Sequence, residues 1–283
     1  ALGLAEITET PIVLVESMRA GPSTGMPTKP EQGDLELVLY TSQGDSNRVV
    51  FAPADPCEAY EQTRAAFELA YKYHLPAIVV YDQKLSGELR NVPKSFFERE
   101  VTPDIPNTFT ADELSEETHS HGRFHRYQYE NENTPDGVSP RPIPGQKGGR
   151  FLASGNEHHP TGQLFEDPDN RVAQMDRRLA KLDAVRAWLD ARETSHQTFM
   201  GPEDADYGIV TWGSHQGTVR EAVERLNAQG QPVRGLGVSD IAPFPEQEVR
   251  AFLESVDACL VVEMNATAQF RGVVQKELEQ VGT

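Results

Sequence analysis

An apolar run followed by a long loop rich in glycine and proline is the feature that most limits how this chain can fold. Residues 11–15 have the length and residue types of a short β-strand, and their continuous apolar character predicts burial on both faces. Residues 19–34 then form a loop, because proline and glycine interrupt regular structure. A buried strand that ends in an irregular loop is typical of an open α/β sheet, where ligands bind at the carboxyl ends of strands.

The loop carries compact hydrogen-bond donors and two cations. Its candidate binding side chains are Arg19, Ser23, Thr24, Thr28 and Lys29. A guanidinium binds planar oxyanions through two parallel hydrogen bonds, and hydroxyls can fill the remaining lone pairs. The loop is therefore a candidate site for a carboxylate or a phosphate. A purely structural loop, whose serine and threonine side chains bond to nearby backbone, fits the spacing equally well.

Length, charge and cysteine content set the broad class. At 283 residues the chain can form roughly two domains, and its net charge of −18 argues against nucleic acid or an anionic membrane as a partner. Acidic residues are spread along the chain, so we expect either a halophilic protein adapted to high salt or an ordinary acidic protein. The two cysteines, Cys57 and Cys259, are too few for a four-cysteine iron–sulfur cluster, and a cytoplasmic location is the simplest expectation.

A strand–helix–strand pattern follows the loop. Residues 47–53 and 75–82 are mostly apolar and predict two strands. Between them, Asp55 and Pro56 are a typical N-cap and first-turn pair for a helix. The buried face of that helix is predicted from an apolar stripe at Ala59, Thr63, Phe67 and Ala70. This alternation indicates a βαβ unit and a parallel sheet.

Residues 94–200 predict a linker or excursion that leads into a long helix. Prolines, glycines and charges dominate up to residue 162, which is typical of a segment packed over a neighbouring surface. The histidines at positions 119, 121, 125, 158 and 159 fit no zinc spacing, so solvated or interface histidines are expected. Residues 170–191 predict an amphipathic helix with an apolar stripe at Met175, Leu179, Leu182, Val185 and Leu189. The exposed side of that helix is expected to carry Asp176, Arg177, Arg178 and Lys181.

The last segment predicts a second α/β unit. Strands are expected at residues 207–213, 232–238 and 258–263, and helices at 219–230, 246–254 and 267–279, the first ended by Gly230. The glycines at positions 208 and 213 lack the spacing of a dinucleotide-binding fingerprint. Gly213 and Ser214 could receive a phosphate at a helix start, although a tight turn explains them more simply.

The order of these pieces resembles the α subunit of the 2-oxoacid:ferredoxin oxidoreductases, enzymes that use thiamine diphosphate. The most specific part of the resemblance is Arg19-x-Gly21-Pro22-Ser23-Thr24-Gly25-x-Pro27-Thr28-x-x-x-Gln32-x-Asp34-Leu35. Shorter matches are Thr8-Glu9-Thr10-Pro11, Gly155-Asn156-Glu157-His158, Glu166-Asp167-Pro168-x-Asn170-Arg171 and Val262-Glu263-x-Asn265. The resemblance covers nearly the whole chain.

The resemblance implies an α/β fold in three parts. Residues 1–93 correspond to the carboxyl-terminal portion of a parallel-sheet domain that binds the aminopyrimidine of thiamine diphosphate. Residues 94–200 are the linker with its long helix, and residues 201–283 resemble a truncated transketolase C-terminal-like α/β domain. Residues 1–7 look like the end of a helix, so we expect a fragment that lacks the start of its first domain and the fused γ-like N-terminal domain of the family.

The function that the resemblance implies is oxidative decarboxylation of pyruvate or 2-oxoglutarate to its acyl-coenzyme A, with electrons passed to ferredoxin. By the family pattern, Arg19 and Thr24 bind the substrate carboxylate, Thr28 lies near the variable end of the substrate, and Ser23 belongs to the same substrate-binding set. No catalytic residue is expected within this chain, because the glutamate that activates the aminopyrimidine lies before residue 1 in the family.

The resemblance also implies that this chain is inactive alone. It assigns the pyrophosphate site, Mg²⁺ and the iron–sulfur cluster to a β subunit that forms a heterodimer with this one, and it implies no metal ligand here. Coenzyme A is the implied co-substrate and ferredoxin the implied electron acceptor. The alternative is a non-catalytic α/β scaffold or interaction module that retains the fold. A transketolase-type enzyme without ferredoxin fits the pattern of residues 21–34 less well.

Overall fold

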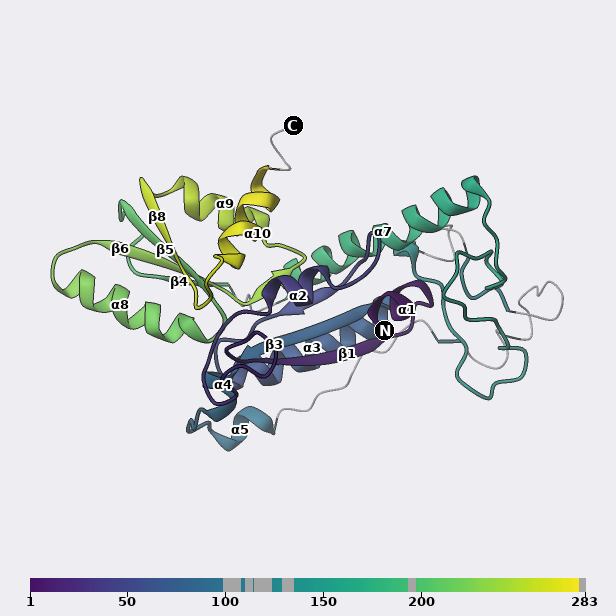
Figure 1. Ribbon diagram of the computed structural model, residues 1–283, viewed down its shortest axis with the longest axis horizontal. Helices are drawn as coiled ribbons and strands as arrows, with labels where there is room; N and C mark the ends of the chain where they lie inside the picture. Colours follow the sequence, from purple (N-terminus) through teal and green to yellow (C-terminus); the bar gives the residue numbers. More distant parts are fainter. Residues whose placement is uncertain (99–107, 110–113, 115–123, 129–134, 193–196, 280–283) are drawn as a thin grey trace.

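A computed structural model describes residues 1–98, 108–109, 114, 124–128, 135–192 and 197–279 (Figure 1). Up to the long helix, the elements are α1 (Leu2–Ile7), β1 (Ile12–Met18), α2 (Leu35–Tyr40), β2 (Val49–Phe51), α3 (Pro56–Tyr73), β3 (Pro76–Asp82), α4 (Gln83–Gly87), α5 (Lys94–Phe97), the 3₁₀ turn η1 (Pro135–Gly137) and α7 (Pro168–Asp190). The remaining elements are β4 (Thr198–Met200), β5 (Tyr207–Trp212), the 3₁₀ turn η2 (Gly213–His215), α8 (Gln216–Ala228), β6 (Val233–Val238), β7 (Asp240–Ala242), α9 (Glu246–Glu254), β8 (Ala258–Val262) and α10 (Gln269–Glu279).

The first sheet has the strand order β1-β3-β2-β7. β1 and β2 both pair with β3 in parallel, and β7 pairs antiparallel with β2. The predicted βαβ unit is confirmed, because α3 connects the parallel strands β2 and β3. The predicted N-cap is also confirmed: the Asp55 carboxylate accepts hydrogen bonds from the backbone N–H groups of Cys57 (2.8 Å) and Glu58 (3.0 Å).

The second sheet has the order β4-β6-β5-β8, in which β5 pairs in parallel with β6 and β8, and β4 pairs antiparallel with β6. α9 has the predicted bounds, and the predicted strands and helices of this unit are all present. Gly230, which has a φ of 77°, follows the end of α8 as expected. The two mostly parallel sheets confirm the predicted α/β class.

A continuous hydrophobic core joins the two sheets. It includes Met18, Leu35, Val50 and Ile78 from the first sheet region and Trp212, Leu236, Phe252 and Phe270 from the second. β7 extends the connection, since it follows β6 of the second sheet in the chain and pairs with β2 of the first. The domain limits at residues 93 and 200 stay a prediction. In the described part of the chain, the helices are too short or too polar to cross a membrane.

Two expectations about burial are wrong in the first sheet region. β1 is not buried on both faces, because it lies at the edge of its sheet, and Leu14 and Val15 are 39% and 57% exposed. The expected stripe of α3 is wrong at Phe67, which is 53% exposed, whereas Ala70 is buried as expected. The buried face of this helix consists instead of Gln62, Ala65, Ala66, Leu69, Ala70 and Tyr73.

The buried face of α7 differs most from the prediction. Arg177 and Lys181, which were expected outside, are buried, whereas Leu179 is 42% exposed. The buried residues of this helix are Asn170, Gln174, Arg177, Lys181 and Val185. The reason is that α7 packs against a buried carboxylate and the backbone carbonyls of Tyr127 and Gly137, and reaches a hydrophobic cluster only in its second half, at Val185. In Figure 1 this helix runs from the excursion at the right toward the centre of the molecule.

Candidate functional site

The candidate loop begins where two parallel strands end. Met18 of β1 pairs in register with Asp82 of β3, so both strands finish at the same edge of the first sheet. Arg19, Ser23, Thr24 and Thr28 all lie on this loop and are exposed, as is Lys29. The structure therefore brings these side chains onto one exposed loop at the edge where α/β proteins bind ligands.

Three backbone hydrogen bonds shape the loop. Met26 N–H donates to Ala20 C=O (2.8 Å), Lys29 N–H to Met26 C=O (3.0 Å), and Ala20 N–H to Lys29 C=O (3.2 Å). Gly25 has a φ of 48°, and a Cβ atom there would lie 1.8 Å from the Ala20 carbonyl oxygen. Only glycine can occupy this position without moving the backbone.

The downstream end of the loop is fixed by Gln32, which is 0% exposed. Its side-chain Nε2 donates to the Trp212 carbonyl (3.0 Å), and its Oε1 accepts from Met264 N–H (3.0 Å). Its backbone N–H donates to the Met264 carbonyl (2.7 Å), and its carbonyl accepts from Asn265 Nδ2 (3.1 Å). The loop is thus attached to the carboxyl ends of β5 and β8 as well as to β1.

An open hollow lies between the loop and the turn after β8. It is lined by Ala20, Gly21, Met26, Pro30, Glu31, Glu263, Met264 and Asn265. None of the four candidate substrate-binding side chains is among these lining residues. The cations and hydroxyls of the loop are exposed and lie outside this hollow.

Arg19 is flanked by carboxylates. Burial raises the pKa of Glu16, and the charge of Asp34 raises it further, whereas Arg19 lowers it. Burial and the Glu31 carboxylate likewise raise the pKa of Asp34, again opposed by Arg19. Arg19 is therefore a positive group with carboxylates around it. Such a site attracts anions only weakly from a distance but can still hold one anion in direct contact with the guanidinium.

A second polar cluster links the ends of β3 and β5. The Ser214 hydroxyl donates to Asp82 Oδ2, Asp82 Oδ1 accepts from Leu85 N–H at the start of α4, and Lys84 Nζ donates to the Ser214 carbonyl (2.8 Å). Burial lowers the pKa of His215, and Asp82 opposes this shift. The predicted tight turn at Gly213 is confirmed, with a φ of 57°. With Ser214 bonded to Asp82, this turn links the two sheets.

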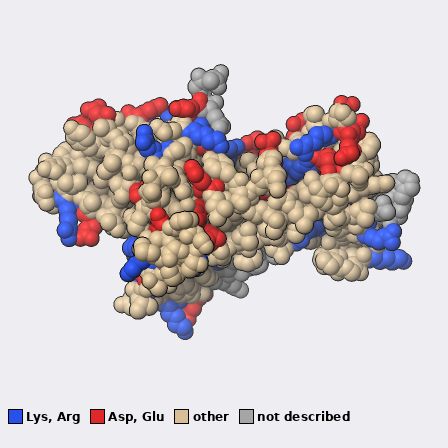
Figure 2. Space-filling view, in the orientation of Figure 1, with Lys and Arg blue, Asp and Glu red and all other residues tan. Residues whose placement is uncertain are grey.

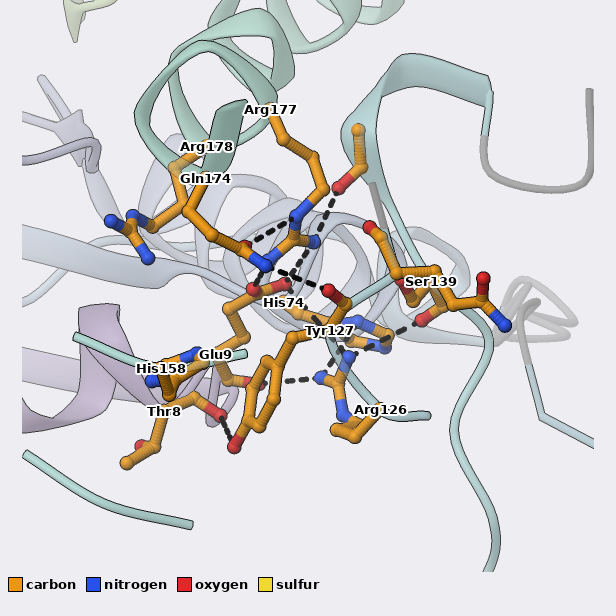
Figure 3. A network of polar contacts seen from close by, with 12 residues as sticks. Thr8, Glu9, His74, Arg126, Tyr127, Ser139, His158, Gln174, Arg177 and Arg178 are labelled. Carbon is orange, nitrogen blue, oxygen red and sulfur yellow. Dashed lines mark hydrogen bonds and ion pairs between the residues drawn. The ribbon is translucent and has the colours of Figure 1, made fainter. Parts of the chain in front are cut away.

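A buried charge network, shown in Figure 3, was missed by the sequence analysis. Glu9, at the junction of α1 and β1, accepts hydrogen bonds from the Arg177 guanidinium and from Lys181 Nζ (2.6 Å), and Arg126 lies 3.8 Å away. Glu9 has a φ of 50°, an uncommon conformation for this residue type. Burial alone would raise the pKa of Glu9, but the three cations hold it well below its usual range. Burial lowers the pKa of Lys181 to about 7, against the pull of Glu9.

The rest of the network satisfies neighbouring backbone groups. Arg126 donates to the Glu9 carbonyl (3.0 Å) and to His74 Nδ1 (3.1 Å), and burial lowers the pKa of His74 well below its usual value. The Tyr127 hydroxyl donates to the Thr8 carbonyl (3.3 Å), while Gln174 Nε2 donates to the Tyr127 carbonyl (2.9 Å). These contacts fasten α7 and the excursion to the start of β1 (Figure 3).

Three of the four short sequence matches outside the loop meet at or beside this network, and the fourth, at residues 262–265, lies at the turn after β8. Asn170 Nδ2 donates to the His158 carbonyl (3.2 Å), and Glu157 pairs with Arg171 (2.5 Å) and Arg178 (2.6 Å). The His158 ring lies 4.1 Å from that of Tyr127. These segments and the Thr8-Glu9 segment all match the same family pattern. That shared match was the one sequence signal that could have indicated a common structural role.

The histidines form no metal centre in the described part of the chain, where no group of three potential ligands gathers. His158 is 0% exposed and its Nδ1 lies 2.9 Å from the Asn156 carbonyl, so the expectation of a solvated or interface histidine is wrong there. Burial is explained by its place against Tyr127. His119 and His121 lie outside the described residues.

Two family models match the chain. Residues 1–177 match that of the pyruvate flavodoxin/ferredoxin oxidoreductase, thiamine diphosphate-binding, and residues 205–282 match that of the pyruvate:ferredoxin oxidoreductase core domain II. The chain is 31% identical over 268 residues to the 2-oxoacid:ferredoxin oxidoreductase subunit alpha of Saccharolobus solfataricus, covering 95% of this chain and 40% of that protein. It is 30% identical over 280 residues to the 2-oxoglutarate synthase subunit KorA of Archaeoglobus fulgidus, covering 99% of this chain and 66% of that subunit.

A solved structure shares the fold. It is the 2-oxoglutarate:ferredoxin oxidoreductase from Magnetococcus marinus with 2-oxoglutarate, coenzyme A and succinyl-CoA bound, at a TM-score of 0.81 and 33% identity over 98% of this chain and 45% of that one. The chain thus spans less than half the length of several of the relatives that it matches. From the two family matches and these relatives, the chain belongs to the family of the 2-oxoacid:ferredoxin oxidoreductase α subunits.

Proposed function

We propose that the chain is the substrate-holding part of an α subunit that decarboxylates a 2-oxo acid oxidatively, forms its acyl-coenzyme A and passes the electrons to ferredoxin. The observation that carries this proposal is the exposed loop, on which one guanidinium and three hydroxyls lie at the carboxyl ends of parallel strands. The names of two relatives support the reaction class, since they are a 2-oxoacid:ferredoxin oxidoreductase subunit and a 2-oxoglutarate:ferredoxin oxidoreductase.

In this proposal Arg19 binds the carboxylate of the 2-oxo acid with its two terminal nitrogens. Thr24, and Ser23 beside it, donate hydroxyl hydrogen bonds to the remaining carboxylate lone pairs. Thr28 lies further along the loop and contacts the variable end of the substrate. The acidic surrounding of Arg19 would weaken the binding of a more highly charged anion, so a carboxylate suits this loop better than a diphosphate.

Thiamine diphosphate is the cofactor that the matched family binds. The hollow beside the loop does not fit its diphosphate, because Glu31 and Glu263 are among the residues that line it. We therefore propose that the diphosphate, its Mg²⁺ and the iron–sulfur cluster are held by a β subunit. The substrate site, to which this loop contributes, is then complete only in the assembled enzyme, a heterodimer or a larger complex.

Both 2-oxoglutarate and pyruvate remain proposed substrates. The relative from Magnetococcus marinus has 2-oxoglutarate and succinyl-CoA bound, and the Archaeoglobus fulgidus relative is a 2-oxoglutarate synthase subunit, which favours 2-oxoglutarate. The family model, by contrast, is named for pyruvate. Coenzyme A and ferredoxin are the proposed co-substrate and acceptor in either case.

A substrate screen tests the proposal. The full-length α subunit is assembled with its β subunit, loaded with cofactors, and offered a series of 2-oxo acids with a redox dye as acceptor. We expect reduction of the dye that requires both a 2-oxo acid and coenzyme A. An assembled and loaded complex that reduces no dye with any 2-oxo acid would instead support a scaffold that retains the fold without the activity.

A further inference from the structure

We propose that Gln32 is a positioning residue: it fixes the substrate loop to the turn after β8, so that the second sheet sets where Arg19 and the loop hydroxyls lie. The inference rests on the proposed function, because the position of the loop affects catalysis only if the loop binds substrate. It assigns a shared role to Gln32 and to the Glu263-x-Asn265 segment, which lie more than two hundred residues apart in the chain.

The loop has little else to hold it. Between Met18 and Leu35 the buried residues are Ala20 and Gln32, and every residue from 21 to 29 is exposed. The three backbone hydrogen bonds within the loop fix its internal shape but do not connect it to the rest of the molecule. Its placement therefore depends on its two ends, β1 on one side and Gln32 on the other.

All four hydrogen bonds of Gln32 go to the second sheet region. Its side-chain amide uses Trp212 at the end of β5 and Met264 after β8, and its backbone uses Met264 and Asn265. Because the amide is completely buried, its removal would leave the Trp212 carbonyl and the Met264 N–H group unpaired, with no water to replace the amide. A buried amide with this many partners specifies one arrangement of the two segments.

The turn that receives Gln32 is itself fixed. Glu263 Oε2 accepts from Asn265 Nδ2 (2.6 Å) and from the backbone N–H of Phe270 (2.9 Å), which ties the turn to the first residues of α10. Gln269 then reinforces the contact: its Nε2 donates to the Gly33 carbonyl (2.8 Å) and its Oε1 accepts from Glu36 N–H (3.2 Å). The loop is therefore attached to a turn that is itself held by hydrogen bonds to α10.

The test compares Gln32→Met with Gln62→Met in the full-length α subunit assembled with its β subunit. Gln62 is a matched control, because it is also 0% exposed and its amide also bonds to a segment far away in the chain, at the Ser239 carbonyl (3.2 Å) between β6 and β7 and at Asp240 Oδ1 (3.2 Å) of β7. We expect Gln32→Met to raise the KM for the 2-oxo acid on the order of 10- to 100-fold, as misplaced binding groups do, with the KM for coenzyme A unchanged. Gln62→Met should lower thermal stability but leave both KM values in place.

Hydrogen–deuterium exchange of the α subunit provides a readout that does not depend on activity. In peptides covering residues 19–34, Gln32→Met should exchange faster than wild type, whereas Gln62→Met should not. If Gln32→Met does not fold, Gln269→Met removes the outer contact with Gly33 and Glu36 and should shift KM and exchange in the same direction.

Unchanged exchange in residues 19–34 would overturn the anchoring role, and faster exchange with an unchanged KM would overturn the positioning role. A wild-type complex that turns over no 2-oxo acid would refute the proposed function. In that case the exchange data would still decide whether Gln32 holds the loop, so the two failures are distinguishable.

Discussion

Replacing Glu9 with Gln probes the buried network that joins α7 to the first sheet. The substitution keeps the size of the side chain but removes the negative charge that Arg177, Lys181 and Arg126 share in the interior. Removing one partner of a buried ion pair costs about 3–5 kcal/mol, because the remaining charges stay buried and uncompensated. At about 2–4 °C per kcal/mol for a chain of this size, the melting temperature should fall by roughly 6–20 °C.

The control for Glu9→Gln is Glu157→Gln. Glu157 also pairs with two arginines, but water reaches all three side chains, since Glu157 and Arg178 are 12% exposed and Arg171 is half exposed, so the loss should be smaller than for Glu9. Calorimetry of both variants at neutral pH makes the comparison. If Glu9→Gln melts no lower than Glu157→Gln, the cations do not depend on Glu9 and the reasoning about the network is refuted.

The network also predicts a dependence on pH through Lys181. Its pKa of about 7 in the folded chain lies below the value of about 10.4 for an exposed lysine, so between these values the unfolded chain binds more protons. Stability then rises with pH, and the contribution of this one group rises by up to about 1.4 kcal/mol per pH unit. The free energy of unfolding in urea, measured from pH 7 to 9, should show this increase in wild type relative to Lys181→Met. A difference between the two that is constant over this range would contradict the shifted pKa.

Other predictions concern the loop and the surface. Thr24→Val should lower kcat/KM for the 2-oxo acid by a factor that corresponds to about 1–3 kcal/mol. Thr28 substitutions should instead reorder the preference among 2-oxo acids. Equal effects on all substrates would show that Thr28 does not contact the variable end of the substrate. Gly25→Ala should raise the KM for the 2-oxo acid with little change in melting temperature, because its Cβ would collide with the Ala20 carbonyl in an exposed loop; an unaltered KM would show that the loop shape is not needed. If the net charge of −18 is an adaptation to salt, the melting temperature should rise steeply from dilute buffer to molar KCl, and a flat response would indicate ordinary acidity. On the face in Figure 2, acidic and basic side chains are interspersed, so screening would act on both repulsive and attractive pairs.

The regular elements were largely predictable because their signals are local. Apolar runs gave β3, β5, β6 and β8, and the Asp55–Pro56 pair marked the start of α3. The strands β4 and β7 have three residues each, too few for a periodic pattern, and they form because they pair with β6 and β2. Their existence depends on neighbours that lie far away in the chain.

Burial was harder to predict where polar groups pack together. Hydrophobic periodicity placed Leu179 inside and Arg177 outside, since it cannot anticipate a buried carboxylate supplied from residue 9. Similarly, Gln32 and Gln62 are completely buried and bond to segments far away in the chain, Gln32 at the end of β5 and Gln62 at Ser239 and Asp240. For the candidate site, the sequence identified the loop and its donors, but the anchoring of Gln32 became visible only in three dimensions.

Arg19→Ala, in the assembled full-length enzyme, tests the central claim most directly. If Arg19 holds the substrate carboxylate, its loss should cost about 2–5 kcal/mol, which lowers kcat/KM on the order of 30- to several thousand-fold. Arg19→Lys should recover only part of this, because an ammonium cannot form the two parallel hydrogen bonds of a guanidinium. Assembly with the β subunit and the melting temperature should be unchanged, since Arg19 is exposed in this chain. A well-folded, fully assembled Arg19→Ala enzyme that turns over 2-oxo acids within a few-fold of wild type would contradict the assignment of this loop as the substrate site.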